Sequence, residues 1–151
     1  EVFMIRTLHP IAGITAFLTI LSFWVSTVVV ELGGDHQAIA AVKLGVLWGL
    51  LLLIPAIAVT GITGFKLGGA SPHPGVAQKR RRMPLIALNG LLVLVPCAIV
   101  LQQRASAGQF DQIFNAVQAV ELLAGAINLT LLGLSIRDGF RLTRRFGVGA
   151  A

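Results

Sequence analysis

The sequence predicts an all-α integral membrane protein whose four transmembrane helices form an up-down-up-down bundle. Its composition supports this fold class, because 56% of the 151 residues are hydrophobic and only 12% are charged, whereas about 25% of the residues of soluble domains are charged. Four apolar runs follow one another, and each is long enough to cross the hydrocarbon core, which takes about 20 helical residues. The shorter alternating segments that are typical of membrane β-barrels do not occur in the sequence.

The four helices are predicted from the apolar runs in the order in which these occur. The first three runs are bounded by charged side chains, and the fourth is interrupted only by Glu121. The first and third connections are short, and short connections make consecutive helices antiparallel neighbours. The second connection is longer and contains Gly, Ser and Pro, which are typical of a loop. The prediction is therefore a single domain, 1–151, with helices over about 8–31, 39–65, 84–103 and 111–136, a cytoplasmic loop over 66–82 and a cytoplasmic tail over 137–151.

Small residues mark the faces along which the first two helices are expected to pack. Four small hydroxyl side chains follow in the first helix at spacings of four, three and four residues, so they share one face. Gly45 and Gly49 repeat this spacing in the second helix. In membranes such faces pack against another helix, because small residues allow close approach. We call the set in the first helix the hydroxyl stripe, and it consists of Thr15, Thr19, Ser22 and Ser26.

The basic residues predict the orientation of the helices in the membrane. All of the 12 Lys and Arg residues except Lys43 and Arg104 fall at the end of the bundle that holds both termini and the loop over 66–82. Because cytoplasmic loops of membrane proteins are enriched in Lys and Arg, both termini are predicted to be cytoplasmic. The expected location is the cytoplasmic (inner) membrane of a bacterium.

A run of four basic residues precedes the third predicted helix. Such a cluster binds anionic lipid headgroups, at about 1 kcal/mol per basic residue near the surface, or it serves only to fix the orientation. Nucleic acid is not an expected partner, because the basic residues flank apolar runs instead of lining one soluble face. The cluster consists of Lys79, Arg80, Arg81 and Arg82.

Polar side chains inside the apolar runs are the candidate functional residues. Gln118, Glu121 and Asn128 lie near one side of the fourth helix, so this side is expected to face inward or toward a partner. Asn89 of the third helix lies at a level comparable with that of Asn128. These two amides, together with Thr15 and Thr60, are expected to form a hydrogen-bonded layer between helices.

Glu121 is a functional-site candidate, because an ionised and unpaired carboxylate inside a membrane costs several kcal/mol. Lys43, at the outer end of the second helix, is the nearest basic side chain that could pair with it. One interpretation is a structural Glu121–Lys43 pair, or a protonated glutamic acid that bonds to an amide. The other is that Glu121 handles a proton, contacts a ligand or meets a partner subunit.

His9 begins the first helix beside Pro10 and is followed by small residues at Ala12, Gly13 and Ala16. This segment resembles the haem-ligating helix of small four-helix b-type cytochromes. The resemblance implies haem b, with His9 as one axial ligand. The second ligand would be Met83, since a thioether can serve as an axial ligand, or His73 of the loop.

The function predicted from the sequence is a non-catalytic one. No nucleophile–base pair, phosphate loop or clustered set of metal ligands occurs in the sequence, so an enzyme is the less favoured class. The chain is expected to be a subunit or partner of a larger membrane complex, bound to other membrane subunits or to further copies of itself. The alternative is a b-type haem or quinone-linked electron-transfer protein, and a third class is a small transporter whose pathway includes Glu121 and Asn128.

Overall fold

The computed structural model describes residues 2–69 and 74–147. Four helices in this part of the chain are long and apolar enough to cross a membrane, and no strand occurs in it. The predicted all-α fold with four membrane-length helices is thereby confirmed, and it has the pattern of a multi-pass membrane protein. The elements are α1 (Val2–Gly33), α2 (His36–Gly68), α3 (Pro74–Asn89), η1 (Gly90–Leu94), α4 (Val95–Ser106) and α5 (Gln112–Gly147).

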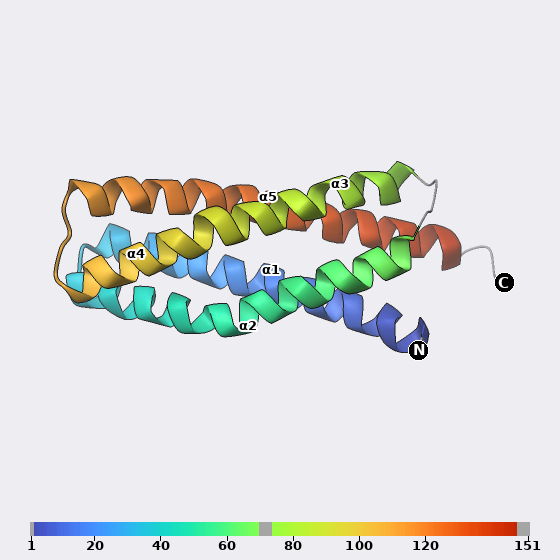
Figure 1. The fold of residues 1–151 in the computed structure, drawn as a ribbon, viewed down its shortest axis with the longest axis horizontal. Helices are drawn as coiled ribbons and strands as arrows, with labels where there is room; N and C mark the ends of the chain where they lie inside the picture. Colours follow the sequence, from blue (N-terminus) through green and yellow to red (C-terminus); the bar gives the residue numbers. More distant parts are fainter. Residues whose placement is uncertain (1, 70–73, 148–151) are drawn as a thin grey trace.

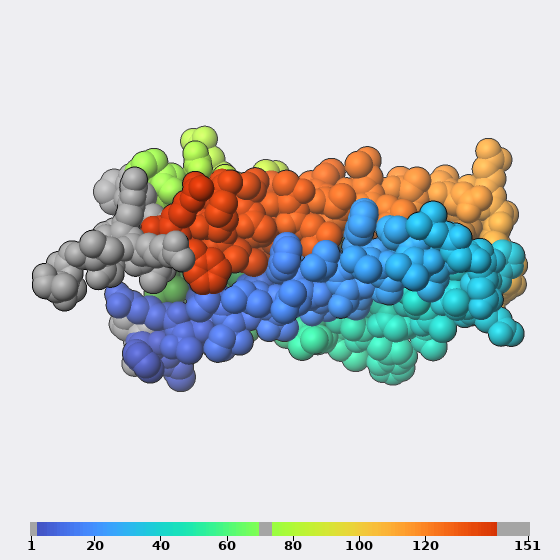
Figure 2. Space-filling view, turned by 180° about the vertical axis from the view of Figure 1, so that it is seen from behind, coloured from blue at the N-terminus to red at the C-terminus, as the bar shows by residue number. Residues whose placement is uncertain are grey.

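The helices run antiparallel along one long bundle, in which α3, η1 and α4 form a single span (Figure 1). One end, here called the turn end, holds the short connections from α1 to α2 and from α4 to α5. The start of α1, the facing ends of α2 and α3 and the end of α5 lie at the opposite end, here called the basic end. Seen from behind, α1 and α5 lie side by side along the bundle (Figure 2).

The helices extend beyond the apolar runs from which they were predicted, which corrects two of the predicted boundaries. Residues 74–82, expected in a loop over 66–82, form the first turns of α3, and α5 continues to Gly147 instead of ending at 136. The predicted limits followed the loss of hydropathy, but Lys, Arg and Gln are good helix formers. Pro74 also suits the first turn of a helix.

A π-helical turn interrupts the third span just before Pro96. Proline has no amide hydrogen, and its ring clashes with the carbonyl of the residue four positions earlier. The preceding turn is widened so that the Val95 amide donates to the carbonyl oxygen of Gly90. This turn directly follows Asn89, one of the candidate site residues.

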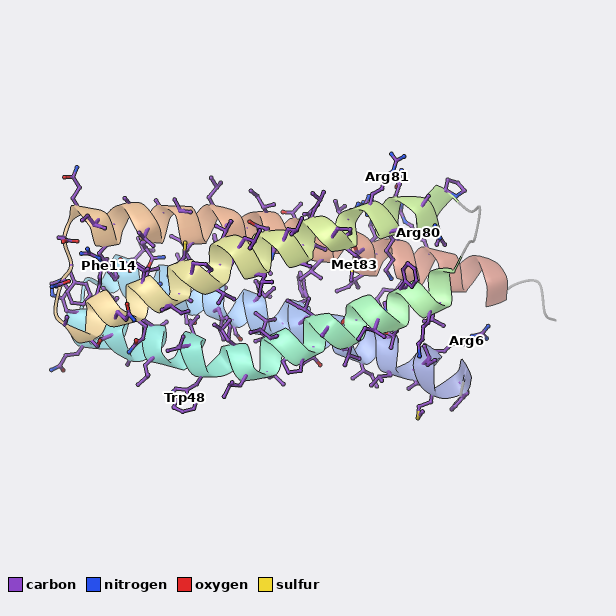
Figure 3. The ribbon with its side chains drawn as sticks, in the orientation of Figure 1. Arg6, Trp48, Arg80, Arg81, Met83 and Phe114 are labelled. Atoms are coloured by element: carbon purple, nitrogen blue, oxygen red, sulfur yellow. The ribbon has the colours of Figure 1, made fainter. Side chains whose placement is uncertain are left out.

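The core lies along the axis of the bundle, where all four spans contribute buried side chains. A second, smaller cluster at the turn end surrounds Phe114, whose exposed fraction is only 1%. The opposite faces of the helices carry large exposed apolar side chains such as Trp48, which points away from the bundle (Figure 3). This is the arrangement that lipid tails require, because they are as apolar as leucine. The main core consists of Ala16, Ile20, Val46, Leu50, Leu53, Ala56, Ile86, Ala98 and Leu132.

Glycines of α2 allow its close approach to α1. A Cβ added to Gly49 would overlap the ring of Phe23, and one added to Gly64 would lie 2.9 Å from Cε1 of His9. A Cβ added to Gly45, in contrast, would meet nothing within 4 Å. The two glycines of the predicted small-residue spacing therefore differ, since only Gly49 faces α1.

Polar contacts fix the turn end. Asp111 accepts a hydrogen bond from the amide of Phe114 at 3.0 Å and so caps the start of α5. Nη1 of Arg104, near the end of α4, donates to both oxygens of the same carboxylate at 2.9 and 2.8 Å. His36, the first residue of α2, stacks on Phe110 with a centroid distance of 4.0 Å.

The Asp111 cap makes the stability of the bundle depend on pH. The amide of Phe114, and then Arg104, hold the pKa of Asp111 below its usual value. A carboxylate whose pKa is lower in the folded state stabilises that state above its unfolded pKa, and this effect disappears as the pH falls through the folded pKa. Asp111→Asn is therefore expected to be less stable than the wild type at pH 7 and indistinguishable from it in strong acid. Thermal unfolding of both proteins between strong acid and pH 7 checks this expectation. A difference in unfolding temperature that stays constant with pH would contradict it.

Candidate functional site

A buried ion pair joins α2 and α5 in the half of the bundle nearer the turn end. Nζ of Lys43 lies 2.6 Å from Oε2 of Glu121, and the exposed fractions of the two side chains are 0% and 12%. Gln118, one turn before Glu121, donates from Nε2 to the same oxygen at 3.0 Å. The structure thus brings together three residues that the sequence singled out, and it shows the pair that one interpretation of Glu121 requires.

A third span carries a second carboxylate in the same half of the bundle. Glu31, near the end of α1, interacts electrostatically with both Lys43 and Glu121. Its Oε1 is buried and has no hydrogen-bond partner in the described structure, and the same holds for Oε1 of Gln118. We call Glu31, Lys43, Gln118 and Glu121 the carboxylate cluster.

An apolar cavity of about 50 Å³ adjoins the carboxylate cluster at Glu121. Side chains of all four spans line it, among them Thr27 and Trp24 of α1. The indole Nε1 of Trp24 donates to the carbonyl oxygen of Leu122 at 2.9 Å, and this contact ties α1 to α5 beside the cavity. A water molecule needs roughly 10–15 Å³ of such volume and polar partners, so the cavity has room for water next to the carboxylate.

Two amides form the polar contact at the middle of the bundle. Nδ2 of Asn89 donates to Oδ1 of Asn128 at 2.8 Å and to the carbonyl oxygen of Ala124 at 2.9 Å. Asn128, which is fully buried, donates in turn to the carbonyl oxygen of Ile86 at 3.3 Å. Of the four residues of the expected layer, Asn89 and Asn128 bond to each other, whereas the hydroxyl of Thr60 donates to the Ala56 carbonyl of its own helix.

Replacement of Asn128 tests whether this contact holds α3 and α5 together. Asn128→Leu keeps the number of side-chain heavy atoms but removes both hydrogen bonds, and interhelical hydrogen bonds in membranes are worth about 1–2 kcal/mol in model peptides. A loss of this size in the free energy of unfolding, measured by SDS titration in mixed micelles, is the expected result. Thr130→Val is the matched control, because Thr130 is exposed and its hydroxyl donates only to the carbonyl of Ala126 in its own helix. Equal losses in both variants would contradict the assignment.

At the basic end, His9 connects three spans by hydrogen bonds. Nδ1 of His9 lies 2.9 Å from Oγ1 of Thr63, and Nε2 lies 3.0 Å from Nζ of Lys79. An ammonium group can only donate, so Nε2 is the acceptor and the ring proton resides on Nδ1. The hydroxyl of Thr63 donates in turn to the carbonyl oxygen of Val59 at 2.6 Å. His9 is thus held as a neutral, doubly hydrogen-bonded ring.

The basic cluster of α3 divides into inward and outward residues. Besides Lys79, Arg82 turns inward and pairs with Asp138 of α5 at 2.6 Å. Arg80 donates to the carbonyl oxygen of Gly69, and Arg81 points away from the bundle (Figure 3). Only Arg80 and Arg81 therefore remain on the exposed surface for an anionic partner.

The two described residues proposed as haem ligands, His9 and Met83, make other contacts in the structure. Both ring nitrogens of His9 have partners, so an iron at Nε2 would have to replace Lys79. Met83 is half-buried and packs against the main core. His73 lies outside the described residues. The described part of the chain contains no group of three or more His, Cys, Asp or Glu side chains that could hold a metal ion, and haem ligation stays a prediction from the sequence.

Several contacts were not predicted from the sequence, among them the inward contacts of two members of the basic cluster. Lys79 and Arg82 are three residues apart, a spacing that places them on one helical face, and this was the available signal. Nothing in the sequence indicated the partners of Thr63, Trp24 or Glu31, because these depend on how each helix is rotated about its axis.

No protein-family model matches this chain, and comparisons with curated proteins and with solved structures find no significant match. A function for the chain is therefore inferred from the carboxylate cluster, the polar contacts between helices and the exposed helix faces.

Proposed function

We propose that the chain is a non-catalytic subunit of a larger membrane complex, and that a partner helix packs on the hydroxyl stripe of α1. This proposal rests on the hydroxyl stripe, whose side chains are small and lie on an outward face of α1. A helix that met only lipid would gain nothing from small hydroxyl residues there, whereas a partner helix gains close approach.

The contacts of α1 support an outward location of the stripe. Phe17 and Trp24 of α1 meet α5 at Gly133 and Gly125. Successive residues of an α-helix are rotated by about 100°, which places the stripe on roughly the opposite side of α1. Ser22 is exposed, and its three companions are only half-buried.

The hydrogen bonds of the stripe also suit a helix interface. The hydroxyl of Thr19 donates to the carbonyl oxygen of Thr15 at 2.8 Å, and that of Ser26 donates to the carbonyl oxygen of Ser22. Hydroxyl groups that are satisfied within their own helix can be covered by another helix without loss of a hydrogen bond with water.

Extraction of the native protein in mild detergent tests this proposal. The wild type is expected to purify in constant stoichiometry with another membrane subunit or with a differently tagged copy of itself. Ser22→Leu should abolish this association, because the larger side chain prevents close approach. Ala58→Leu is the control, since Ala58 is an exposed small residue of α2 and the substitution should leave the complex intact. A wild type that purifies as a lone monomer would overturn the proposal.

We further propose that the basic end faces the cytoplasm, in the inner membrane of a bacterium. Arg6, Lys66 and Arg81 are exposed there, in line with the positive-inside rule. In a Cys97→Ser background, Arg81→Cys should react with a membrane-impermeant maleimide only in inverted vesicles, and Asp35→Cys only in intact cells. The reverse pattern would refute this orientation.

Arg80 and Arg81 are the residues to which we assign anionic lipid headgroups. The double variant Arg80→Gln/Arg81→Gln should abolish the extra thermal stability that nanodiscs with anionic lipid give over zwitterionic ones. Retention of that extra stability in the variant would count against the assignment.

A further inference from the structure

The cavity beside Glu121 has two polar groups on its wall that make no hydrogen bond with any described residue. One is the hydroxyl of Thr27, a residue whose exposed fraction is only 3%. The hydroxyl of the preceding Ser26, in contrast, donates to a carbonyl oxygen of α1. The other group is Oε1 of Glu121, because Lys43 and Gln118 both contact Oε2. Buried polar groups almost always have a hydrogen-bond partner, so the two groups indicate a ligand in the cavity.

The rest of the cavity wall restricts the size and chemistry of this ligand. The wall is largely apolar and includes Ile20, Leu50 and Leu53 of the main core. Trp24 also lines the cavity, but its Nε1 already donates to a backbone carbonyl. The volume of about 50 Å³ has room for a few water molecules, at roughly 10–15 Å³ each, or for one small organic molecule. The ligand therefore needs one small polar group, and any further atoms must be apolar.

We propose that the cavity is a binding site for a hydroxyl group, which belongs to water or to a small alcohol. A hydroxyl oxygen can accept a hydrogen bond from Thr27 while its proton is donated to Oε1 of Glu121. An alkyl group on the same oxygen would contact the apolar part of the wall. The bound hydroxyl connects α1 to the Lys43–Glu121 pair, which itself joins α2 and α5.

Other classes of ligand fit the cavity less well. A metal cation would compete with the ammonium of Lys43 for the Glu121 carboxylate, and the described residues contain no group of three or more His, Cys, Asp or Glu side chains that could hold one. An anion would be repelled by the same carboxylate. A purely apolar molecule would leave the hydroxyl of Thr27 unpaired, which is unfavourable for a buried polar group.

Water-edited solid-state NMR tests this proposal, because it transfers polarisation from water protons to carbon atoms that lie close to water. In the isotope-labelled full-length protein in lipid bilayers, carbons of Thr27 and Glu121 should receive polarisation at short mixing times. Thr60 is the internal control, since it is similarly buried, does not line the cavity and donates to the carbonyl of Ala56. Carbons of Thr27 that respond as slowly as those of Thr60 would overturn the proposal.

Ala98→Val tests whether the transfer depends on the cavity. Ala98 lines the cavity, so the larger side chain should exclude the ligand and abolish the rapid transfer. Survival of the transfer in this variant would contradict the proposal, because it would then arise from proton exchange at Lys43. Ala58→Val is the matched control, since Ala58 is exposed on α2 and does not line the cavity. The comparison of Thr27 with Thr60 in the wild type is decisive even if Ala98→Val does not fold.

Added ethanol distinguishes the two sources of the hydroxyl group. Transfer from the methyl protons of ethanol to Thr27, with loss of the transfer from water, would identify a small alcohol as a ligand that replaces water. Continued transfer from water alone would identify water as the ligand.

Discussion

Lys43→Met is expected to lower the free energy of unfolding by roughly 3–5 kcal/mol, the usual result of removing one partner from a buried ion pair. The Lys43 side chain is completely buried, so neither lipid headgroups nor water can replace its ammonium group. The variant leaves Glu121 without its cation, and it also removes a positive charge that interacts with Glu31. SDS titration in mixed micelles measures the loss.

A double-mutant cycle separates the loss of the ion pair from the loss of packing. Glu121→Gln should cost less than Lys43→Met, because Glu31 stays within electrostatic range of the remaining ammonium. The double variant should be more stable than Lys43→Met alone, since no carboxylate is then left opposite a missing cation at Glu121. Arg104→Met is the control: it breaks the exposed pair with Asp111, and exposed pairs contribute little. A double variant no more stable than Lys43→Met would show that the pair has no coupling energy.

The spans and the inward face of α5 could be predicted from the sequence, because hydropathy and helical periodicity act within one helix. Gln118 and Asn128 share the polar side of the predicted fourth helix, and both are buried in the structure. Lys43 could be named as the partner of Glu121 for a similar reason. In the sequence, Lys43 is the nearest basic residue to Glu121 in depth, and the structure pairs the two.

The rotation of each helix about its axis could not be predicted in the same way. The periodicity of α1 shows that the hydroxyl stripe shares one face, but not that this face lies opposite α5. Trp24 bonds to a backbone carbonyl beside Gly125, whose missing side chain admits the indole ring. A backbone acceptor leaves no residue type in the sequence by which it could be recognised. Glu31 directly follows the first apolar run, and its residue type marks only the end of that run.

Gly49→Leu is the second substitution for which we expect a large effect, a loss of about 1–3 kcal/mol in the free energy of unfolding through overpacking. A Cβ at this position would already overlap the Phe23 ring, with Cε1 at 2.6 Å. The ring packs against the main core, so its displacement should loosen the contact between α1 and α2. Phe23 also lines the cavity next to Glu121, and its displacement should disturb the carboxylate cluster.

Gly45→Leu is the matched control, because it makes the same change one helical turn away on the same helix. No atom lies within 4 Å of a Cβ at Gly45, so the added side chain extends into lipid and the stability should stay the same or rise slightly, as expected when a helix loses a glycine. SDS titration of both variants under identical conditions compares them directly. The companion change Phe23→Ala in the Gly49→Leu background should recover part of the loss, because it removes the ring that the leucine strikes. Equal effects at the two glycines would mean that helix propensity, and not contact with α1, determines the cost of the leucine.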